Sequence, residues 1–270
     1  MVEKAAPKVL IIPKEAKRKY DSEKHCVFFM LQTGKYLDLL SREYISVTGG
    51  TYRMPISEIT PYREKQVEET VMNRNIVASF ITANNGEMIL SRKSAIIGQY
   101  GFYKQGDVVN GYVSGSISTG IFIDFGQGVR GFCPYEEISN LNFLRPNKLI
   151  QTGNNVNAKI TMIDKSYPYH IHLSIKKAAR KREVEMEEEG NELISVVVGN
   201  PLPDRSGAFC EITPTQIGIM DSAPRFTPSV KLAGREAWAI VKCVKHSFDS
   251  YGNVVDKFKL EFVCWRDEIF

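Results

Sequence analysis

The stretch Gly120-Ile121-Phe122-Ile123-Asp124 decides how this chain folds. It has the form glycine, any residue, aromatic, any residue, acid, and the same form occurs at Gly34–Asp38 and at Gly207–Glu211. The glycines at positions 34, 120 and 207 are about 86 and 87 residues apart, which is the length of one small domain. The sequence therefore predicts an internal repeat.

The middle copy of this pattern predicts an exposed aromatic side chain. Side chains alternate between the two faces of a β-strand, so the aromatic and the acid share one face. Ile121, Ile123 and Phe125 take the other face, which must be the core. Phe122 is therefore expected on the outer face. An aromatic side chain kept outside at the same place in three modules suggests stacking on nucleic-acid bases.

Length and composition describe an ordinary globular chain. It has 270 residues, of which 43% are hydrophobic, and a formal net charge of +4, which permits a polyanionic partner. Neither a membrane-spanning apolar run nor a signal peptide is recognised, so we expect a cytoplasmic protein without a membrane partner. The five cysteines occur singly and are expected to be reduced and mostly buried: Cys26, Cys133, Cys210, Cys243 and Cys264.

The middle third of the chain predicts a small barrel. Five apolar, alternating runs are expected to be strands: Val108–Ser114, Gly120–Phe125, Val129–Cys133, Asn155–Ile163 and His170–Ile175. Five strands with a long connection between the third and the fourth describe a Greek-key barrel of the OB type.

The predicted fold class is all-β dominated, with tandem five-stranded OB-fold barrels and a short charged helical linker. Residues 1–24 are interpreted as a basic flexible leader and residues 25–98 as a degenerate barrel. Residues 104–178 form the clearest barrel, residues 179–191 the charged linker, and residues 192–270 a second degenerate barrel.

Residues 104–178 resemble the S1 RNA-binding domain. The resemblance rests on four segments in the family's order: Gly106–Val113, Gly120–Asp124, Gly128–Pro134 and Leu173–Lys176. It implies an S1-type OB-fold that binds single-stranded RNA. The whole chain resembles a short, three-repeat relative of bacterial ribosomal protein S1.

Weaker resemblances extend into the first part of the chain. Met54–Ile59 is similar to Cys133–Ile138, and Leu90–Lys93 is similar to Leu173–Lys176. The last part keeps the strand Gly207–Glu211 but lacks the Leu-Ser-x-Lys ending.

In S1 domains RNA lies across the outer face of strands two and three, with help from strands one and five. Together with strand parity, this implies the following RNA-binding residues: Phe122, Tyr112, Arg130, Lys159, His170 and Lys176 in the middle module, Tyr36, Arg53, Arg92 and Lys93 in the first, and Phe209 in the third. Phe122 is expected to stack on a base, and the cationic side chains to contact phosphates.

Several of these residues have a second interpretation. Phe122 could pack against a neighbouring module, and His170 could be an ordinary solvated strand residue. Asp124 is expected to make a structural hydrogen bond to the barrel's loops, because a carboxylate repels phosphate. Glu211, with Asp221 and Glu261, is expected to make the third module acidic and so equally suited to contact a protein.

The motifs of catalysis are missing from the sequence. We recognise no nucleophile motif, phosphate-binding loop, dinucleotide fingerprint or metal-ligand cluster, so the chain is predicted to be no enzyme and to use no cofactor or metal. The hypothesis is a single-stranded RNA (mRNA) binding protein that resembles a component of the small ribosomal subunit, with ribosomal proteins as partners. The alternative is an assembly or scaffold protein whose degenerate barrels mainly bind other proteins of a ribonucleoprotein complex.

Overall fold

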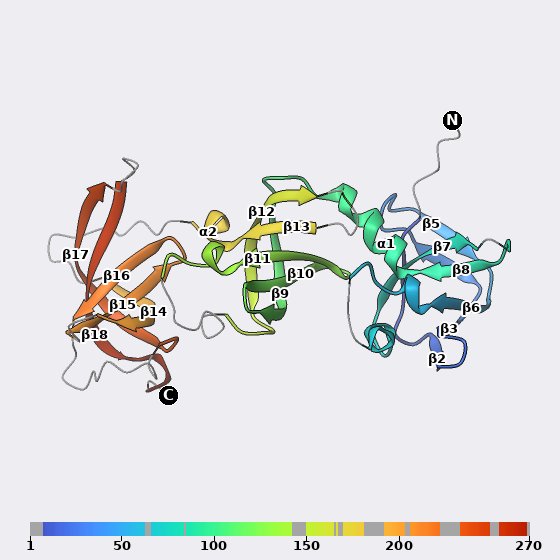
Figure 1. Cartoon of the computed structure of the whole chain (residues 1–270), viewed down its shortest axis with the longest axis horizontal. Coiled ribbons are helices and arrows are strands. Elements are labelled where there is room, and N and C mark those ends of the chain that lie inside the picture. Colours follow the sequence, from blue (N-terminus) through green and yellow to red (C-terminus); the bar gives the residue numbers. More distant parts are fainter. Residues whose placement is uncertain are drawn as a thin grey trace. The chain divides into compact units, whose positions relative to one another are not determined.

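The described part of the chain is built mainly of β-strands (Figure 1). The computed structural model describes residues 8–62, 66–83, 85–141, 150–164, 166, 170–180, 192–202, 206–221, 233–248 and 254–268. Among these residues the helices are short, as α1 (Arg92–Gln99) illustrates with eight residues. No helix in the described ranges is long and apolar enough to cross a membrane.

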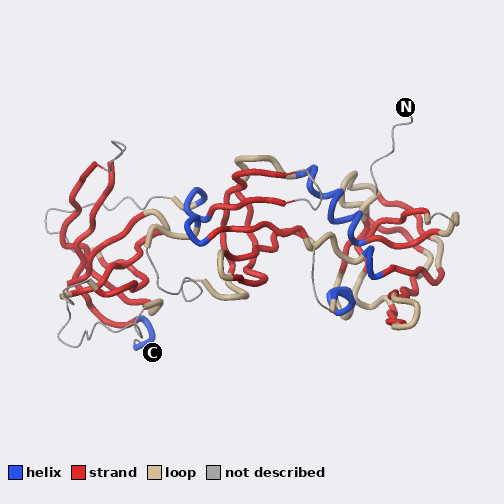
Figure 2. The backbone as a smooth tube through the Cα atoms, viewed as in Figure 1, coloured by secondary structure: helices blue, strands red, loops and turns tan. Residues whose placement is uncertain are grey.

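The middle of the chain forms a closed five-stranded barrel, which we call the central barrel (Figure 2). The strands are β9 (Val108–Ile117), β10 (Gly120–Gly126), β11 (Val129–Pro134), β12 (Asn155–Asp164) and β13 (His170–Ser174), joined in the order β10-β11-β13-β12-β9. All five lie where the sequence predicts them, and the predicted barrel is confirmed.

Strand parity places the core of the central barrel as expected. Ile121 and Ile123 of β10 are fully buried, as are Val129 and Cys133 of β11. Branched apolar side chains at every second position give each strand one apolar face, and closing the sheet turns that face inward. Phe122, between the two isoleucines, is half-buried on the outer side.

A second closed barrel follows, which we call the C-terminal barrel. Its strands are β14 (Leu193–Pro201), β15 (Gly207–Thr213), β16 (Gln216–Asp221), β17 (Glu236–Phe248) and β18 (Val254–Trp265). They close in the order β14-β15-β16-β18-β17, the same circular order as in the central barrel. Its core includes Val196, Cys210, Ala239 and Leu260.

The first module, residues 8–102, differs from the predicted five-stranded barrel. Its described strands form three small sheets instead. The sheets are β1 (Leu10–Ile12), β7 (Ile76–Thr82) and β8 (Met88–Ser91); β2 (Lys17–Asp21), β3 (Cys26–Leu31) and β6 (Gly50–Pro55); and β4 (Gly34–Leu37) with β5 (Tyr44–Val47). One hydrophobic core joins them, with Phe29, Met54 and Leu90 buried in it.

Two predicted boundaries change with this result. The leader expected at residues 1–24 is wrong from Leu10 onward, because β1 and β2 lie within it. Leu10 and Ile12 are buried, and β1 pairs with β7 in the register Leu10↔Ala78, so apolar burial fixes this segment. The charged linker predicted at residues 179–191 lies almost wholly outside the described residues.

The first module and the central barrel share two local structures. In each, a strand ends at a proline, Pro55 or Pro134, and a 3-10 helix follows, at Ile56–Glu58 or Tyr135–Glu137. In each, a buried serine then caps a helix after the last strand of the module. Ser91 accepts a bond from the Ser94 amide that starts α1. Ser174 does the same for α2 (Ile175–Ala178). The similarities read from the sequence are confirmed at this level.

Candidate nucleic-acid interface

The close approach of β10 to β11 explains why the first residue of the motif is a glycine. A Cβ added at Gly120 would overlap the carbonyl oxygen of Cys133 and lie 2.6 Å from Cζ of Phe132. Gly207 occupies the same place in the C-terminal barrel, where a Cβ would overlap the carbonyl oxygen of Met220. Glycine lets the neighbouring strand and its aromatic ring close over this point.

Phe122 lies on the outer face of β10 together with a second ring. The centroids of Phe122 and Phe132 are 5.4 Å apart with 52° between the ring planes. Both side chains are half-buried, so each keeps part of its surface open to solvent. Two adjacent rings on an outer sheet face form an apolar platform of the kind on which bases stack.

Phe132 was missed among the predicted RNA-binding residues. The signal was in the sequence: Val129, Gly131 and Cys133 are buried, so Arg130 and Phe132 must share the opposite face of β11. The alternation that places Arg130 on the outer face also places Phe132 there.

Strands β9 and β12 place Tyr112 and Lys159 on the outside of the central barrel. Tyr112 is 45% exposed and follows the alternation set by the buried Val109 and Val113. Lys159 is half-buried opposite Val108, which is exposed. Between them Asn110 donates a 3.0 Å bond to Asn157, so the outer surface of this strand pair is mixed polar and apolar.

Arg130 is held by a tyrosine of the first module. Its backbone amide donates a 2.9 Å bond to Tyr62 Oη, and its guanidinium lies 5.1 Å from the centroid of the same ring. Tyr62 Oη also lies 2.9 Å from Tyr100 Oη. Burial raises the pKa of the Tyr62 hydroxyl, which therefore stays neutral as a hydrogen-bonding group. Arg130 is thus half-buried and fixed in place.

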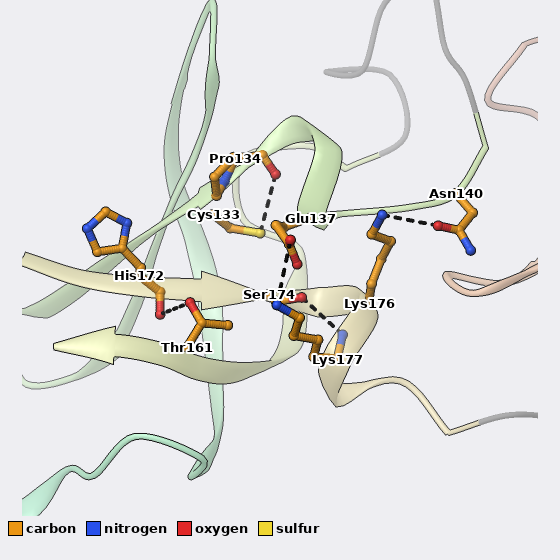
Figure 3. A network of polar contacts seen from close by, with 9 residues as sticks. All are labelled: Cys133, Pro134, Glu137, Asn140, Thr161, His172, Ser174, Lys176 and Lys177. Atoms are coloured by element: carbon orange, nitrogen blue, oxygen red, sulfur yellow. Dashed lines mark hydrogen bonds and ion pairs between the residues drawn. The ribbon is translucent and has the colours of Figure 1, made fainter. Parts of the chain in front are cut away.

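Lys176 lies at the end of the barrel in a polar network (Figure 3). Its Nζ donates a 3.1 Å bond to Asn140 Oδ1, and the adjacent Lys177 lies 3.8 Å from Glu137. Ser174 accepts a 3.0 Å bond from the Lys177 amide and so orients both lysines at the start of α2. Lys176 is half-buried but carries no carboxylate partner among the described residues.

The predicted His170 and its neighbour on the same strand, His172, differ in exposure. His170 is exposed at the start of β13, and His172, two residues on, is half-buried. The backbone carbonyl of His172 accepts a 3.1 Å bond from the hydroxyl of Thr161, a residue of the neighbouring strand β12. The imidazole rings remain available at the outer surface of that strand.

The acid of the motif is a structural acceptor in each copy. Asp124 accepts from the backbone amides of Gly126 and Gly128 in the β10–β11 turn, as the sequence predicted, and burial raises its pKa. Asp38 is buried and accepts from the Val9 amide at 2.8 Å. Glu211 accepts from the Ser139 hydroxyl, and burial raises its pKa as well.

Three of the candidates in the first module are engaged within it. Tyr36 is half-buried, packs against the hydrophobic core and donates a 3.2 Å bond to the Gln32 carbonyl. Arg92 donates to the Ile59 carbonyl at 3.0 Å and covers Gly128, where a Cβ would overlap its guanidinium. Arg53 forms an exposed ion pair with Glu87 at 2.8 Å.

The remaining candidates lie apart from these. Lys93 is half-buried on α1, and Phe209 is half-buried on β15 opposite the partly exposed Ile219. The acidic surface expected around Phe209 is wrong. Besides the half-buried Glu211, Asp221 is paired with Lys259 at 3.1 Å and Glu261 with Lys242 at 2.5 Å, so lysines neutralise both exposed acids.

The cysteines behave as the sequence suggested. All five are free, and Cys26, Cys133 and Cys210 are buried. Burial raises the pKa of the Cys133 and Cys210 thiols to about 12, so neither is a thiolate near neutral pH. Within the described part of the chain no group of three or more His, Cys, Asp or Glu side chains is arranged to hold a metal ion.

Two sequence relatives are bacterial ribosomal proteins. The chain is 26% identical over 148 residues to a small ribosomal subunit protein bS1 homolog of Bacillus cereus, covering 52% of this chain and 38% of that protein. It is 26% identical over 187 residues to the small ribosomal subunit protein bS1 of Staphylococcus saprophyticus, covering 67% of this chain and 43% of that one. The chain spans less than half the length of either relative.

Solved structures with some likeness include the solution structure of GSP13 from Bacillus subtilis. It is 24% identical with a TM-score of 0.27, over 31% of this chain and 65% of that one. A multidomain protein with nucleic acid binding domains from Streptococcus pneumoniae is 13% identical with a TM-score of 0.31, over 94% of this chain and 73% of that one.

A family model fits one part of the chain. Residues 103–176 match the model described as the S1 RNA binding domain. These residues coincide with the central barrel and include the Phe122–Phe132 pair. The segment that matches the S1 RNA binding domain is therefore the one that folds into the barrel β9–β13.

Proposed function

We propose that this chain binds single-stranded RNA across the outer face of the central barrel. The observation that carries the proposal is the Phe122–Phe132 ring pair, half-exposed on β10 and β11 within the segment that matches the S1 RNA binding domain. Stacking of a base on an aromatic side chain contributes about 1–3 kcal/mol and tolerates any base. The expected ligand is therefore an unpaired strand of little sequence preference.

Cationic side chains of the same barrel supply the phosphate contacts. Lys159 on β12 and Lys176 on α2 are half-buried lysines whose stems pack on the barrel. Arg130, held by Tyr62, offers a guanidinium already fixed in position, so less entropy is lost when it meets a phosphate. Tyr112 and His170 add exposed rings on β9 and β13.

The test is fluorescence anisotropy of the full chain with a labelled, unstructured 24-nucleotide RNA at two salt concentrations. Phe122→Ala is expected to weaken binding about tenfold through the lost stacking, and Phe122→Trp to restore it. Tyr44→Ala, which removes an exposed ring on β5 outside the proposed sites, is the matched control. Affinity that is independent of salt and equal in all variants would contradict the proposal.

We further propose that the chain acts beside the small ribosomal subunit and holds mRNA there. Support comes from its relatives, which are small-subunit proteins, although this chain spans less than half of them. Co-sedimentation of the chain with small subunits, reduced when Phe122→Ala weakens RNA binding, is the expected result. Full co-sedimentation of a variant that no longer binds RNA would favour the scaffold alternative, in which barrels bind proteins.

A further inference from the structure

We propose a second single-stranded RNA site on the outer face of the sheet β2-β3-β6 in the first module. We call this surface the first-module face, formed by Lys17, Lys19, Phe28, Met30 and Arg53. It lies outside residues 103–176, the segment matched by the family model. The class of ligand rests on the proposed function, and the position of the site rests on the sheet itself.

The registers of the three strands place these side chains in two rows. One row runs Lys19, Phe28, Arg53 across β2, β3 and β6. The next runs Lys17, Met30, Thr51. Residues that pair across strands share a face of the sheet, so each row presents its members side by side.

The opposite face of this sheet is the core, so the two rows must face outward. Val27, Phe29 and Met54 alternate with the row residues, and each of the three is fully buried. Met30 is 54% exposed and Phe28 is half-buried in the middle of the first row. An aromatic ring and a thioether left at the surface between cations need a reason other than packing.

The charge of the face favours a polyanion. Lys17, Lys19 and Lys24 are exposed, and Lys24 Nζ lies 5.7 Å from the Phe28 ring centroid. Three acids border them: Asp21, which accepts from the Lys24 amide, Glu23, which is exposed in the same turn as Lys24, and Glu87, which pairs with Arg53. Four cations against three acids leave a small net positive charge around one aromatic ring. This is the combination of stacking and phosphate contacts that single strands require.

Strand β2 is the edge of its sheet, where lysines also prevent pairing with other chains. Edge protection accounts for Lys17 and Lys19. It does not account for Phe28 or Met30, which lie on the central strand β3 and would themselves favour association if left without a ligand.

Arg53 can serve the site despite its ion pair. The side chains of Arg53 and Glu87 are 35% and 46% exposed, and exposed pairs of this kind contribute little free energy. A phosphate oxygen offers the guanidinium the same bidentate geometry as the carboxylate does. Exchange of Glu87 for a phosphate therefore costs little.

The test uses the full chain with two unstructured RNAs, of 24 and 6 nucleotides. The variant Lys17→Glu/Lys19→Glu is expected to weaken binding of the 24-mer about tenfold and to reduce the magnitude of the salt slope by about 1.4, because two phosphate contacts are lost. The control is Lys35→Glu/Lys245→Glu, which changes two exposed lysines elsewhere by the same charge and is expected to change affinity less than about twofold. Both changes lie at exposed positions, and circular dichroism checks the fold.

The outcomes separate this site from the central barrel. If Lys17→Glu/Lys19→Glu behaves like its control while Phe122→Ala still weakens binding, the first-module site is overturned and the barrel site stands. If the lysine variant weakens binding and Phe122→Ala does not, the first-module face stands and the barrel site falls. Phe28→Ala should weaken the 24-mer and spare the 6-mer, which the barrel alone can hold. Equal loss for both RNAs would contradict a separate site.

Discussion

The first module and the central barrel share several sequence patterns and local structures, but they differ in the arrangement of their strands. Both end a strand at a proline followed by a 3-10 helix, and both cap the helix after their last strand with a buried serine. Both present a phenylalanine on an outer sheet face, Phe28 on β3 and Phe122 on β10. They differ in closure, since β9–β13 form one barrel and β1–β8 form three sheets.

In the first module a hairpin, β4–β5, lies between β3 and β6 in the chain and forms a sheet of its own. The pattern Gly34–Asp38 falls on that hairpin, whereas Gly120–Asp124 falls on a barrel strand. A Cβ added at Gly34 would meet only the edge of Tyr36 at 4.0 Å, an ordinary contact. The same five-residue pattern thus occurs in two different structural settings, a separate hairpin and a barrel strand.

The largest effect is expected from valine at the barrel glycine. Gly120→Val should lower the free energy of unfolding of the central barrel by about 3 kcal/mol, because its Cβ overlaps the Cys133 carbonyl and Phe132. Gly34→Ala, in open space, should change stability by less than about 0.5 kcal/mol. Urea unfolding followed by far-ultraviolet circular dichroism measures both.

Equal losses at the two glycines would mean that the first copy of the pattern is constrained as the second is. Gly34 would then have to lie on a strand that a neighbouring strand covers closely. Gly207→Val, in the C-terminal barrel, is the positive control, because its Cβ overlaps the Met220 carbonyl.

The acids of the two copies are expected to respond to pH in opposite directions. Burial alone would raise the pKa of Asp38, but bonds from Ser41, Val9 and Leu40 lower it below its ordinary value. Burial raises the pKa of Asp124. Asp38→Asn should cost about 2 kcal/mol at neutral pH because buried donors lose a charged acceptor, and Asp124→Asn should cost less than about 1 kcal/mol.

The signs follow from which protonation state the fold prefers. The ionised Asp38 stabilises the fold above the unfolded-state pKa, and that stability is lost as pH falls through the folded-state value. The contribution of Asp124 is full below its unfolded-state pKa and declines as pH rises through its folded-state value. As pH rises, the cost of Asp38→Asn should grow up to the unfolded-state pKa of an aspartate, and the cost of Asp124→Asn should shrink above that value. Parallel trends would refute the assignment of the two environments.

The central barrel could be predicted from sequence because its alternation is uninterrupted. Ile121, Phe122 and Ile123 define their faces without reference to any distant residue. The first module could not be predicted in the same way. Its strands β1 and β2 are short and lie in a charged part of the sequence. The pairing of β1 with β7 places Leu10 in the core, and the pairing of β2 with β3 makes β2 part of a sheet.

The candidate residues also divide into those that local alternation places and those that depend on distant contacts. Parity placed Tyr112, Phe122 and Lys159 outside the barrel correctly, because each follows from its own strand. The pattern alone does not show that the half-buried Tyr36 also packs against the core of the first module. The fixing of Arg130 by Tyr62 joins positions 68 residues apart, and no local pattern reports such a contact.

A smaller effect is expected where the first module contacts the β10–β11 turn region. Tyr62→Phe removes the acceptor of the Arg130 amide and the partner of Tyr100, and should cost about 1 kcal/mol. The retained ring keeps its position beneath the Arg130 guanidinium. Hydrogen exchange at the Arg130 amide should quicken in this variant. Unchanged protection would mean that another acceptor replaces Tyr62.

The smallest stability effect, and the sharpest distinction between the two surfaces, is expected at Glu87. The hydrogen bond from Arg53 is the main cause that lowers the pKa of Glu87, yet both side chains are well exposed, so Glu87→Gln should leave the midpoint of urea unfolding unchanged. The same change removes an acid beside Phe28 and releases Arg53 for phosphate. RNA affinity should therefore rise about twofold to fivefold at low salt, and the gain should disappear in Lys17→Glu/Lys19→Glu. Glu261→Gln, which frees Lys242 in the C-terminal barrel, is the control with the same charge change. An equal gain from both variants would reflect net charge alone and would leave the first-module face without a special role.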